Sequence, residues 1–519
     1  MDNEIGRRII GMMLSGKITS REQLQKVKLK LSGEYGLPSV IQNSSILAAA
    51  SPEERAAVEP LLVRKPVRTM SGVAVVAVMT SPHPCPHGKC SYCPGGTDSP
   101  QSYTGKEPAA RRASRNEYDP FLQVRDRIEQ LEAIGHRTDK IDLIVMGGTF
   151  TSRDPEYQEW FVRRCFDAMN DSESRTIEEA KVMNETSEHR CIGLTVETRP
   201  DVFTKDQIDR AMRLGATRVE LGVQILDDEI LQAVERGHGT AEIIRATRES
   251  KDAGLKVCYH IMPGLPGSDP DKDMRSFKKM FDDPDYRPDM LKIYTTLVIE
   301  GTKLYDMWKA GGYTPYDVDT AVDLISNMKS IVPEYVRIQR IQRDIPAPQI
   351  SAGILKSNVR ELVADEMQRR GKECRCIRCR EAGHRGISMD DPERMTIRTM
   401  EYEASGGKEL FISMEYEDSI AGYVRLRISG STASVRELKV FGKMAPIGAE
   451  GDWQHRGIGK ELMDIAERTA RENNADEIRI TSGAGVRGYY RSMGYEEKEP
   501  YMVKAAGQEQ PLRQQRRSP

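Results

Sequence analysis

The sequence has 519 residues, which is too long for one ordinary hydrophobic core and favours two to four domains. Its 77 basic and 79 acidic residues nearly cancel, so the chain as a whole shows no general affinity for nucleic acid, although local charge can still provide it. No segment approaches the ~18 apolar residues of a membrane span, and the first apolar run is too short for a signal peptide. We therefore expect a cytoplasmic protein with no membrane partner, in which thiols stay reduced and clustered cysteines indicate metal or redox chemistry.

The first 335 residues divide into a helical region and a repeating strand–helix region. Residues 1–70 predict polar helices on which basic side chains outnumber the acids, which indicates either a solvated surface or a phosphate-docking one. Between 71 and 335, nearly continuously apolar runs alternate with amphipathic helical stretches, as in parallel strands buried on both faces. The predicted strands lie within 73–80, 140–150, 191–201, 217–224, 255–267 and 290–301. This pattern predicts an α/β fold, a partial TIM-like (βα) barrel with its chemistry at the C-terminal ends of the strands.

Three cysteines directly follow the first predicted strand. Cys85, Cys90 and Cys93 have a C-x4-C-x2-C spacing with no nearby fourth ligand, since neither His83 nor His87 fits a regular ligand spacing. Three thiolates on a [4Fe–4S] cluster leave one iron open to an external ligand. The alternative is a structural zinc site that a remote residue completes.

A linker at 336–395 contains a second cysteine group. Cys374, Cys376 and Cys379, with His384 as an uncertain fourth ligand, have the composition of a structural zinc site. A reduced cysteine-rich surface loop is the alternative.

A second domain is predicted at 396–507, where strands of mostly antiparallel character surround a glycine-rich helix start. Gln454, Arg456, Gly457 and Gly459 open this helix, and free N–H groups at such a start suit a pyrophosphate. Residues 508–519 predict a disordered basic tail.

The cysteine segment, followed by "IVMGGTF", resembles the cluster-binding loop and glycine-rich segment of the radical S-adenosylmethionine (radical SAM) superfamily. More members of that superfamily use a C-x3-C-x2-C spacing. The resemblance implies a [4Fe–4S] cluster at the three cysteines and a neighbouring S-adenosylmethionine site. We expect the latter to involve Gly147, Gly148, Glu197 and Gln224.

The second domain resembles the GNAT acetyltransferases. "QHRGIGK" is similar to their pyrophosphate loop, "VRELKVFG" to their central strand and "GVRGYYRSMGY" to their closing helix. This resemblance implies an acetyl-CoA site with catalytic tyrosines at Tyr489 and Tyr490, for which core packing is the alternative. The predicted acetyl-CoA contacts are Lys140, Glu437, Leu438, Lys439, Val440, Gln454, Arg456, Gly457, Ile458, Gly459, Lys460 and Tyr490.

Both modules in one chain, with "SYCPGG", "VETRPD", "RDIPAP" and "GYYRSMGY", resemble the Elongator catalytic-subunit family, from about residue 70 to 505. That family modifies the wobble uridine of tRNA. The resemblance implies that a 5′-deoxyadenosyl radical activates the acetyl methyl of acetyl-CoA for attachment to carbon five of the base. Contacts to the anticodon stem-loop are expected from residues 1–70 and from Lys106, Arg111, Arg112 and Arg115.

Two other functions fit parts of the pattern. One is a protein lysine acetyltransferase with a structural iron–sulfur cluster; the other is a tRNA-binding scaffold with an inactive acetyl-CoA domain. The first requires neither S-adenosylmethionine nor reductant. The sequence does not identify the electron donor, such as a ferredoxin or flavodoxin, or decide whether the chain forms a homodimer.

Overall fold

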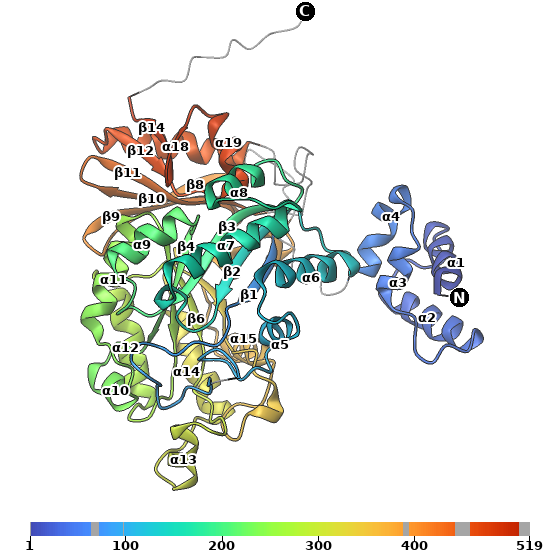
Figure 1. The fold of residues 1–519 in the computed structure, drawn as a ribbon, viewed down its shortest axis with the longest axis horizontal. Helices are drawn as coiled ribbons and strands as arrows, with labels where there is room; N and C mark the ends of the chain where they lie inside the picture. Colours follow the sequence, from blue (N-terminus) through green and yellow to red (C-terminus); the bar gives the residue numbers. More distant parts are fainter. Residues whose placement is uncertain (1, 64–71, 97, 388–393, 442–456, 508–519) are drawn as a thin grey trace, which may run out of the picture.

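The computed structural model describes residues 2–63, 72–96, 98–387, 394–441 and 457–507. Its first part consists of helices α1 (Asp2–Leu14), α2 (Arg21–Glu34), α3 (Asn43–Ala48) and α4 (Pro52–Leu62), which lie at one side of the molecule (Figure 1). They pack around a small apolar core of their own that includes Ile9 and Ile46. Gly135, which follows helix α6 (Pro120–Ala133), lies against Val63. This contact joins the four-helix unit to the rest of the chain.

A seven-stranded, entirely parallel sheet forms the central domain, with its strands in sequence order. The strands are β1 (Ala74–Met79), β2 (Lys140–Met146), β3 (Arg190–Thr198), β4 (Arg218–Gln224), β5 (Lys256–Ile261), β6 (Met290–Ile293) and β7 (Arg337–Arg340). Strand β1 pairs only with β2 in the described part of the chain, so the barrel is open at one side. The predicted partial barrel is confirmed.

Helices follow the strands and cover the outside of this sheet. They are α5 (Pro108–Arg115), α6 (Pro120–Ala133), α7 (Pro155–Asn170), α8 (Ile177–Asn184), α9 (Lys205–Arg213), α10 (Asp228–Ala233), α11 (Thr240–Asp252), α12 (Pro270–Asp282), α13 (Lys303–Lys309) and α14 (Val318–Ser330). The alternation in β2 is regular: Ile141, Leu143 and Val145 are buried against helices, and the intervening side chains face the barrel interior. Strand β7 lies just beyond residue 335, where the sequence pattern no longer predicted βα units.

A short linker of α15 (Val359–Arg369), α16 (Ile377–Arg380) and α17 (Ala382–Arg385) leads to the second domain. That domain contains a mixed sheet in the order β13-β14-β12-β11-β10-β9-β8. Its strands are β8 (Thr396–Ala404), β9 (Gly407–Tyr416), β10 (Ser419–Ser429), β11 (Thr432–Val440), β12 (Glu477–Ile480), β13 (Glu496–Lys498) and β14 (Tyr501–Ala505). Only the β11–β12 pair is parallel, which confirms the predicted antiparallel character; α18 (Ile458–Glu472) and α19 (Arg487–Arg491) complete the domain.

The two sheets are joined by buried ion pairs. Arg436 of β11 donates to both carboxylate oxygens of Asp289, next to the first residue of β6, at 2.6 and 2.7 Å. Arg427 of β10 pairs with Asp252 at the end of α11. Because Arg436 and Asp289 are fully buried, this contact fixes the second domain against the N-terminal ends of the barrel strands.

Within the described ranges, no helix has the length and apolar character that crossing a bilayer requires.

Candidate active sites

The three clustered cysteines lie at the C-terminal mouth of the barrel. The loop that follows β1 folds over the strand ends, so Cys85, Cys90 and Cys93 line a cavity of about 170 Å³ together with the ends of β3, β4 and β5. Their sulfurs do not form a group in which all lie within 4.8 Å of one another. This wider arrangement suits a polynuclear cluster, which holds each thiolate on a different iron.

The polar environment of Cys90 favours its thiolate form. Burial alone raises the pKa of this thiol, but the Arg236 guanidinium at 3.5 Å and His87 Nε2 at 3.2 Å together lower it to about 6. Burial raises the pKa values of Cys85 and Cys93, whose sulfurs lie 3.2 Å from Thr149 Oγ1 and from the Ser102 amide nitrogen, respectively. Three thiols with polar partners fit an iron–sulfur cluster, which takes thiolate ligands.

The glycine pair after β2 provides a bare backbone surface beside this cavity. Gly147 and Gly148 have φ values of +139° and +81°, which favour glycine. A Cβ atom on Gly147 would lie 2.0 Å from Thr80 Oγ1, and one on Gly148 would lie 2.7 Å from the Gln101 carbonyl oxygen. Gly148 lines the cavity, as do Glu197 and Gln224. The structure therefore brings three of the four predicted S-adenosylmethionine residues to the cysteine cavity, with Gly147 adjacent.

A buried charge cluster forms the floor of the same cavity. Lys292 contacts the Glu220 carboxylate and lies 3.9 Å from Glu197, whose other oxygen accepts a hydrogen bond from the Tyr103 hydroxyl at 2.6 Å. His260 Nε2 lies 2.8 Å from Glu220. Burial raises the pKa of the Glu220 carboxyl, but Lys292 and His260 more than compensate and hold it well below its usual range. Glu220 and Lys292 therefore stay charged without solvent, so they orient polar ligands with little reorganisation.

The predicted acetyl-CoA residues surround a second cavity of about 540 Å³ between the two domains. From the barrel it is lined by Lys140 and by the first residues of β4 and β5; from the second domain it is lined by Glu437, Leu438, Lys439, Val440, Gly457, Ile458, Gly459, Lys460, Tyr489 and Tyr490. Gln454 and Arg456 lie outside the described residues. Burial lowers the pKa values of Lys140, Lys256 and Lys439, three cationic side chains that face this cavity.

A gap between two strands opens onto this cavity. Strands β11 and β12 pair only from Thr432–Val435 with Glu477–Ile480, and the last bond runs from the Thr481 amide to the Val435 carbonyl. Beyond it, residues 437–440 pair with β10 on one side, and no other described strand pairs with their second edge. Their other backbone edge is therefore available to an extended ligand.

The helix start and the tyrosine pair lie at the end of this gap. Gly457 caps α18 with φ +86°, and a Cβ on Gly459 would be 3.0 Å from the Tyr489 hydroxyl. Tyr490 is buried and stacks edge-on against the partly exposed Tyr489, with ring centroids 5.2 Å apart. Both hydroxyls are kept protonated, because burial raises the pKa of each tyrosine.

A third cavity, of about 640 Å³, is strongly basic and adjoins the first. Its lining includes Lys106, Arg111, Arg112 and Arg115, as predicted for an RNA contact, together with Arg127 and Arg343. Arg112 is largely buried and donates to the Ala77 carbonyl of β1, and Arg115 pairs with Asp126. Pro108, Arg343 and Asp344 line both this cavity and the cysteine cavity, so an anionic polymer here lies beside the barrel mouth.

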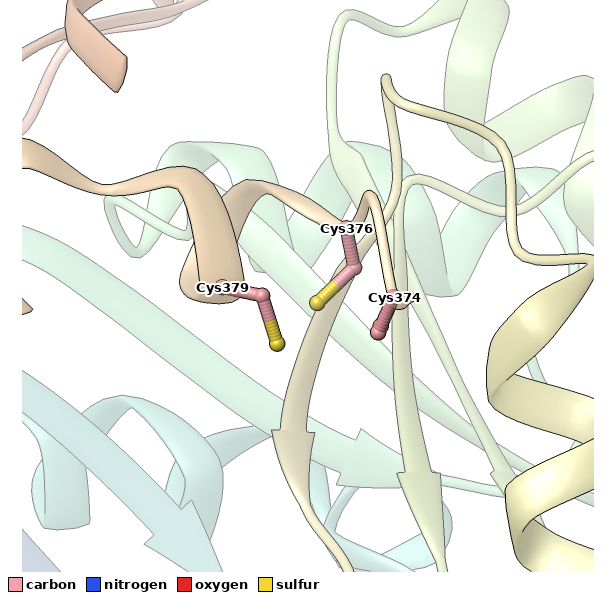
Figure 2. A group of neighbouring side chains, drawn as sticks. All are labelled: Cys374, Cys376 and Cys379. Carbon is pink, nitrogen blue, oxygen red and sulfur yellow. The ribbon is translucent and has the colours of Figure 1, made fainter. Parts of the chain in front are cut away.

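The second cysteine group converges in the linker. Figure 2 shows Cys374, Cys376 and Cys379 as neighbours in the linker, and their sulfurs all lie within 4.8 Å of each other. The adjacent thiols hold the pKa of Cys376 well below its usual range. His384 is not in this group; its Nε2 lies 3.8 Å from the Glu381 carboxylate. The donor set fits a thiophilic cation such as zinc with three ligands.

Several residues at these sites were not predicted from the sequence. Glu220 and Lys292 are charged side chains inside otherwise apolar strands, which was a usable signal for a functional interior. Tyr103 and Arg343 gave no such signal, because they come from loops that only the fold brings to the barrel mouth. Lys256 was not predicted either, because it is the first residue of β5 and does not lie inside an apolar run.

Comparison with protein families and known proteins agrees with this architecture. Residues 3–70 match the ELP3 N-terminal domain, 81–279 the radical SAM superfamily, 288–369 the radical SAM C-terminal domain and 389–511 the acetyltransferase (GNAT) domain. The solved structure of the archaeal Elp3 of Methanocaldococcus infernus with an N-terminal deletion superposes with a TM-score of 0.75 at 48% identity, over 84% of this chain and all of that one.

Two named relatives align over nearly their full lengths. The tRNA uridine(34) acetyltransferase of Methanocaldococcus infernus is 50% identical over 96% of this chain and 98% of its own length. Human Elongator complex protein 3 is 42% identical over 95% of this chain and 96% of its own length. The chain therefore belongs to the family of radical SAM enzymes with a GNAT domain that contains the tRNA uridine(34) acetyltransferases and Elongator complex protein 3.

Proposed function

We propose that this chain modifies the wobble uridine of tRNA at carbon five, joining the acetyl methyl carbon of acetyl-CoA to the base. The observation that carries the proposal is the pair of cavities at opposite ends of the same barrel strands. One contains three cysteines and a glycine pair, and the other contains an open strand edge and a helix start. Neither alone accounts for attachment of an acetyl methyl to an aromatic carbon.

The cysteine cavity is the site of radical generation in this proposal. Cys85, Cys90 and Cys93 hold the cluster, and the backbone at Gly147 and Gly148 lies close enough to receive the methionine end of S-adenosylmethionine. When bound, the cluster supplies the electron that cleaves the sulfonium compound and yields a 5′-deoxyadenosyl radical. An external one-electron donor, such as a ferredoxin or flavodoxin, reduces it.

The interdomain cavity binds and orients acetyl-CoA. The free edge of residues 437–440 pairs with the pantetheine arm, and the N–H groups at the start of α18 receive the pyrophosphate. Lys140 reaches the ligand from the barrel side. The protonated Tyr489 and Tyr490 hydroxyls are hydrogen-bond donors for the thioester end.

The basic cavity binds the anticodon stem-loop. Lys106 and Arg111 are directed at the same hollow as Arg343, which also faces the cysteine cavity. Phosphate contacts there place a splayed loop base at the barrel mouth. Arg112 supports the helix through its bond to β1 rather than reaching outward.

The test is reconstitution of the full chain with iron and sulfide in the absence of oxygen, followed by mass spectrometry of tRNA nucleosides. A carboxymethyl-type product on uridine that requires both S-adenosylmethionine and acetyl-CoA is expected. Acetylation of peptide lysines without reductant would instead support a protein acetyltransferase, and tRNA binding with no product would support a scaffold.

We also propose zinc for the linker cysteines. Cys374, Cys376 and Cys379 supply three thiolates, and the ion would tie β7 to the second domain, because the Ile377 amide donates to Val336 and Arg380 pairs with Glu415 of β9. Metal analysis of the Cys376→Ser variant, with loss of one zinc per chain and retention of iron, is the expected outcome.

A further inference from the structure

The two cavities open at opposite ends of the barrel, which raises a distance problem for the proposed function. Lys140 is the first residue of β2 and faces the interdomain cavity, whereas Gly147 follows its last residue beside the cysteine cavity. Seven residues of extended strand span about 23 Å. The acetyl methyl must approach the site of radical generation to within about 3–3.5 Å.

The cavities abut inside the barrel along one wall. Val73, just before β1, lines the interdomain cavity, and Val75 of β1, the next inward residue, lines the cysteine cavity. On β2 the same change occurs between Asp142 and Ile144. Consecutive inward positions are about 7 Å apart along a strand. A single layer of inward-facing side chains therefore separates the interdomain cavity from the cysteine cavity.

This layer is not filled as a barrel core normally is. Val75 is 43% exposed although it points into the barrel; its partner on β2 is Asp142, whose own partner on β3 is Gly193, which has no side chain. Closed barrels fill this region with bulky branched residues. The β1–β2 side therefore has open space beside Val75, with the Asp142 carboxylate on its β2 wall.

The opposite side of the layer is polar and incompletely bonded. Arg218 donates to Asp142 at 3.0 Å and lies 3.8 Å from Glu220. Arg218 Nε, Glu220 Oε1 and Thr195 Oγ1 are buried without a hydrogen-bond partner. Buried polar atoms of this kind mark a place that water or a ligand satisfies.

From these features we infer that the barrel interior is a passage, through which the acetyl end of the pantetheine arm moves along the β1–β2 wall from the interdomain cavity to the cysteine cavity. This inference rests on the proposed function. The methyl group meets Val75, Ala77 and Ile144, and the thioester oxygen meets the unsatisfied donors of Arg218 and Thr195. The arm is long and flexible, whereas cofactors at the cysteine cavity are held by the fixed ends of strands.

The test narrows the passage at its cysteine-cavity end, where Val75 and Ala77 lie. In the reconstituted full chain, Val75→Phe and Ala77→Leu are expected to lower modified uridine formation about 100-fold, the effect of misplacing a reacting group by about 1 Å. Acetyl-CoA affinity should change less than about twofold, because neither residue lines the interdomain cavity, and product formation should fall much more than 5′-deoxyadenosine release does. Val182→Phe, the same substitution at an exposed position of α8, is the matched control.

Three outcomes are decisive. Unchanged product in both variants would overturn the passage, as would a product loss matched by equal loss of 5′-deoxyadenosine release, because the effect would then belong to the cysteine cavity. If Val75→Phe does not fold, Ala77→Leu carries the test. Failure of the parental chain to make any product contradicts the proposed function instead, so the two failures are distinguishable.

A second measurement locates the acyl group directly. A CoA thioester with a photoreactive diazirine acyl chain should label the β1 and β2 segments, 74–79 and 140–146, when irradiated on the full chain. Label confined to 437–440 and 481–483 would place the acyl end permanently outside the barrel and overturn the inference.

Discussion

The buried pair between Arg436 and Asp289 gives a sharp test of how the two domains are held together. Asp289 accepts two hydrogen bonds from Arg436 and a third from the Val257 amide at 2.8 Å, and Lys251 lies 3.9 Å away. Burial alone would raise the pKa of this carboxyl, but Arg436 and Lys251 hold it well below its usual range. Asp289→Asn removes the negative charge of the carboxylate. It also replaces one acceptor oxygen with an NH2 group that faces the N–H donors of Arg436.

Breaking a buried ion pair by removing one partner costs about 3–5 kcal/mol, because the other charge stays buried and uncompensated. For a chain of 519 residues, whose unfolding entropy is about 1.1 kcal/mol/K, that corresponds to a fall in thermal midpoint of about 3–5 °C. Scanning calorimetry at pH 7 measures this shift. Asp285→Asn is the matched control, since its ion pair with Arg248 at 3.5 Å is exposed and is expected to cost less than about 1 kcal/mol.

The pH dependence provides an independent check on the same variant. Because the folded-state pKa of Asp289 is depressed, its contribution to stability is present above the unfolded pKa of about 3.9 and is lost as the pH falls below it. The difference in midpoint between parent and Asp289→Asn should therefore shrink below about pH 4. Equal shifts for Asp289→Asn and Asp285→Asn at pH 7 would refute the assignment of the interdomain pair.

Three further changes test the candidate sites. Cys90→Ala should abolish release of 5′-deoxyadenosine while acetyl-CoA affinity, measured by calorimetry, stays unchanged; loss of folding would make the cluster a scaffold. Gly147→Ala places a Cβ 2.0 Å from Thr80 Oγ1 at φ +139° and should weaken S-adenosylmethionine binding at least about tenfold, whereas the open Gly96→Ala should not. Lys140→Ala should raise the acetyl-CoA dissociation constant about tenfold without affecting S-adenosylmethionine cleavage, and an unchanged constant would remove Lys140 from that site.

The sequence predicted the barrel well because its strands are buried on both faces. Continuous apolar runs such as 74–79 leave no other assignment when helical stretches alternate with them. Strand β7 was not predicted, since "RIQR" is a polar four-residue segment at the sheet edge. Arg112 shows a related limit: a local excess of basic residues does not reveal which side chain of α5 faces β1.

The interior of the sites required the fold. Glu220 and Lys292 are 72 residues apart, and only the order of β4, β5 and β6 brings them together. The cysteine loop, the glycine pair and the helix start at Gly457 were recognisable because backbone chemistry demands particular residues at short spacing. The contact of Lys140 with the second domain's cavity was implied by resemblance and not by any local pattern.

The central claim is that a radical made at the cysteine cavity takes hydrogen from the acetyl methyl of acetyl-CoA. The most direct measurement uses acetyl-CoA with a trideuterated methyl group in the anaerobically reconstituted chain, with tRNA and S-adenosylmethionine, and reads the mass of the released 5′-deoxyadenosine. One deuterium in 5′-deoxyadenosine, formed in step with modified uridine, is the predicted result. Modified uridine accompanied by unlabelled 5′-deoxyadenosine would contradict the account.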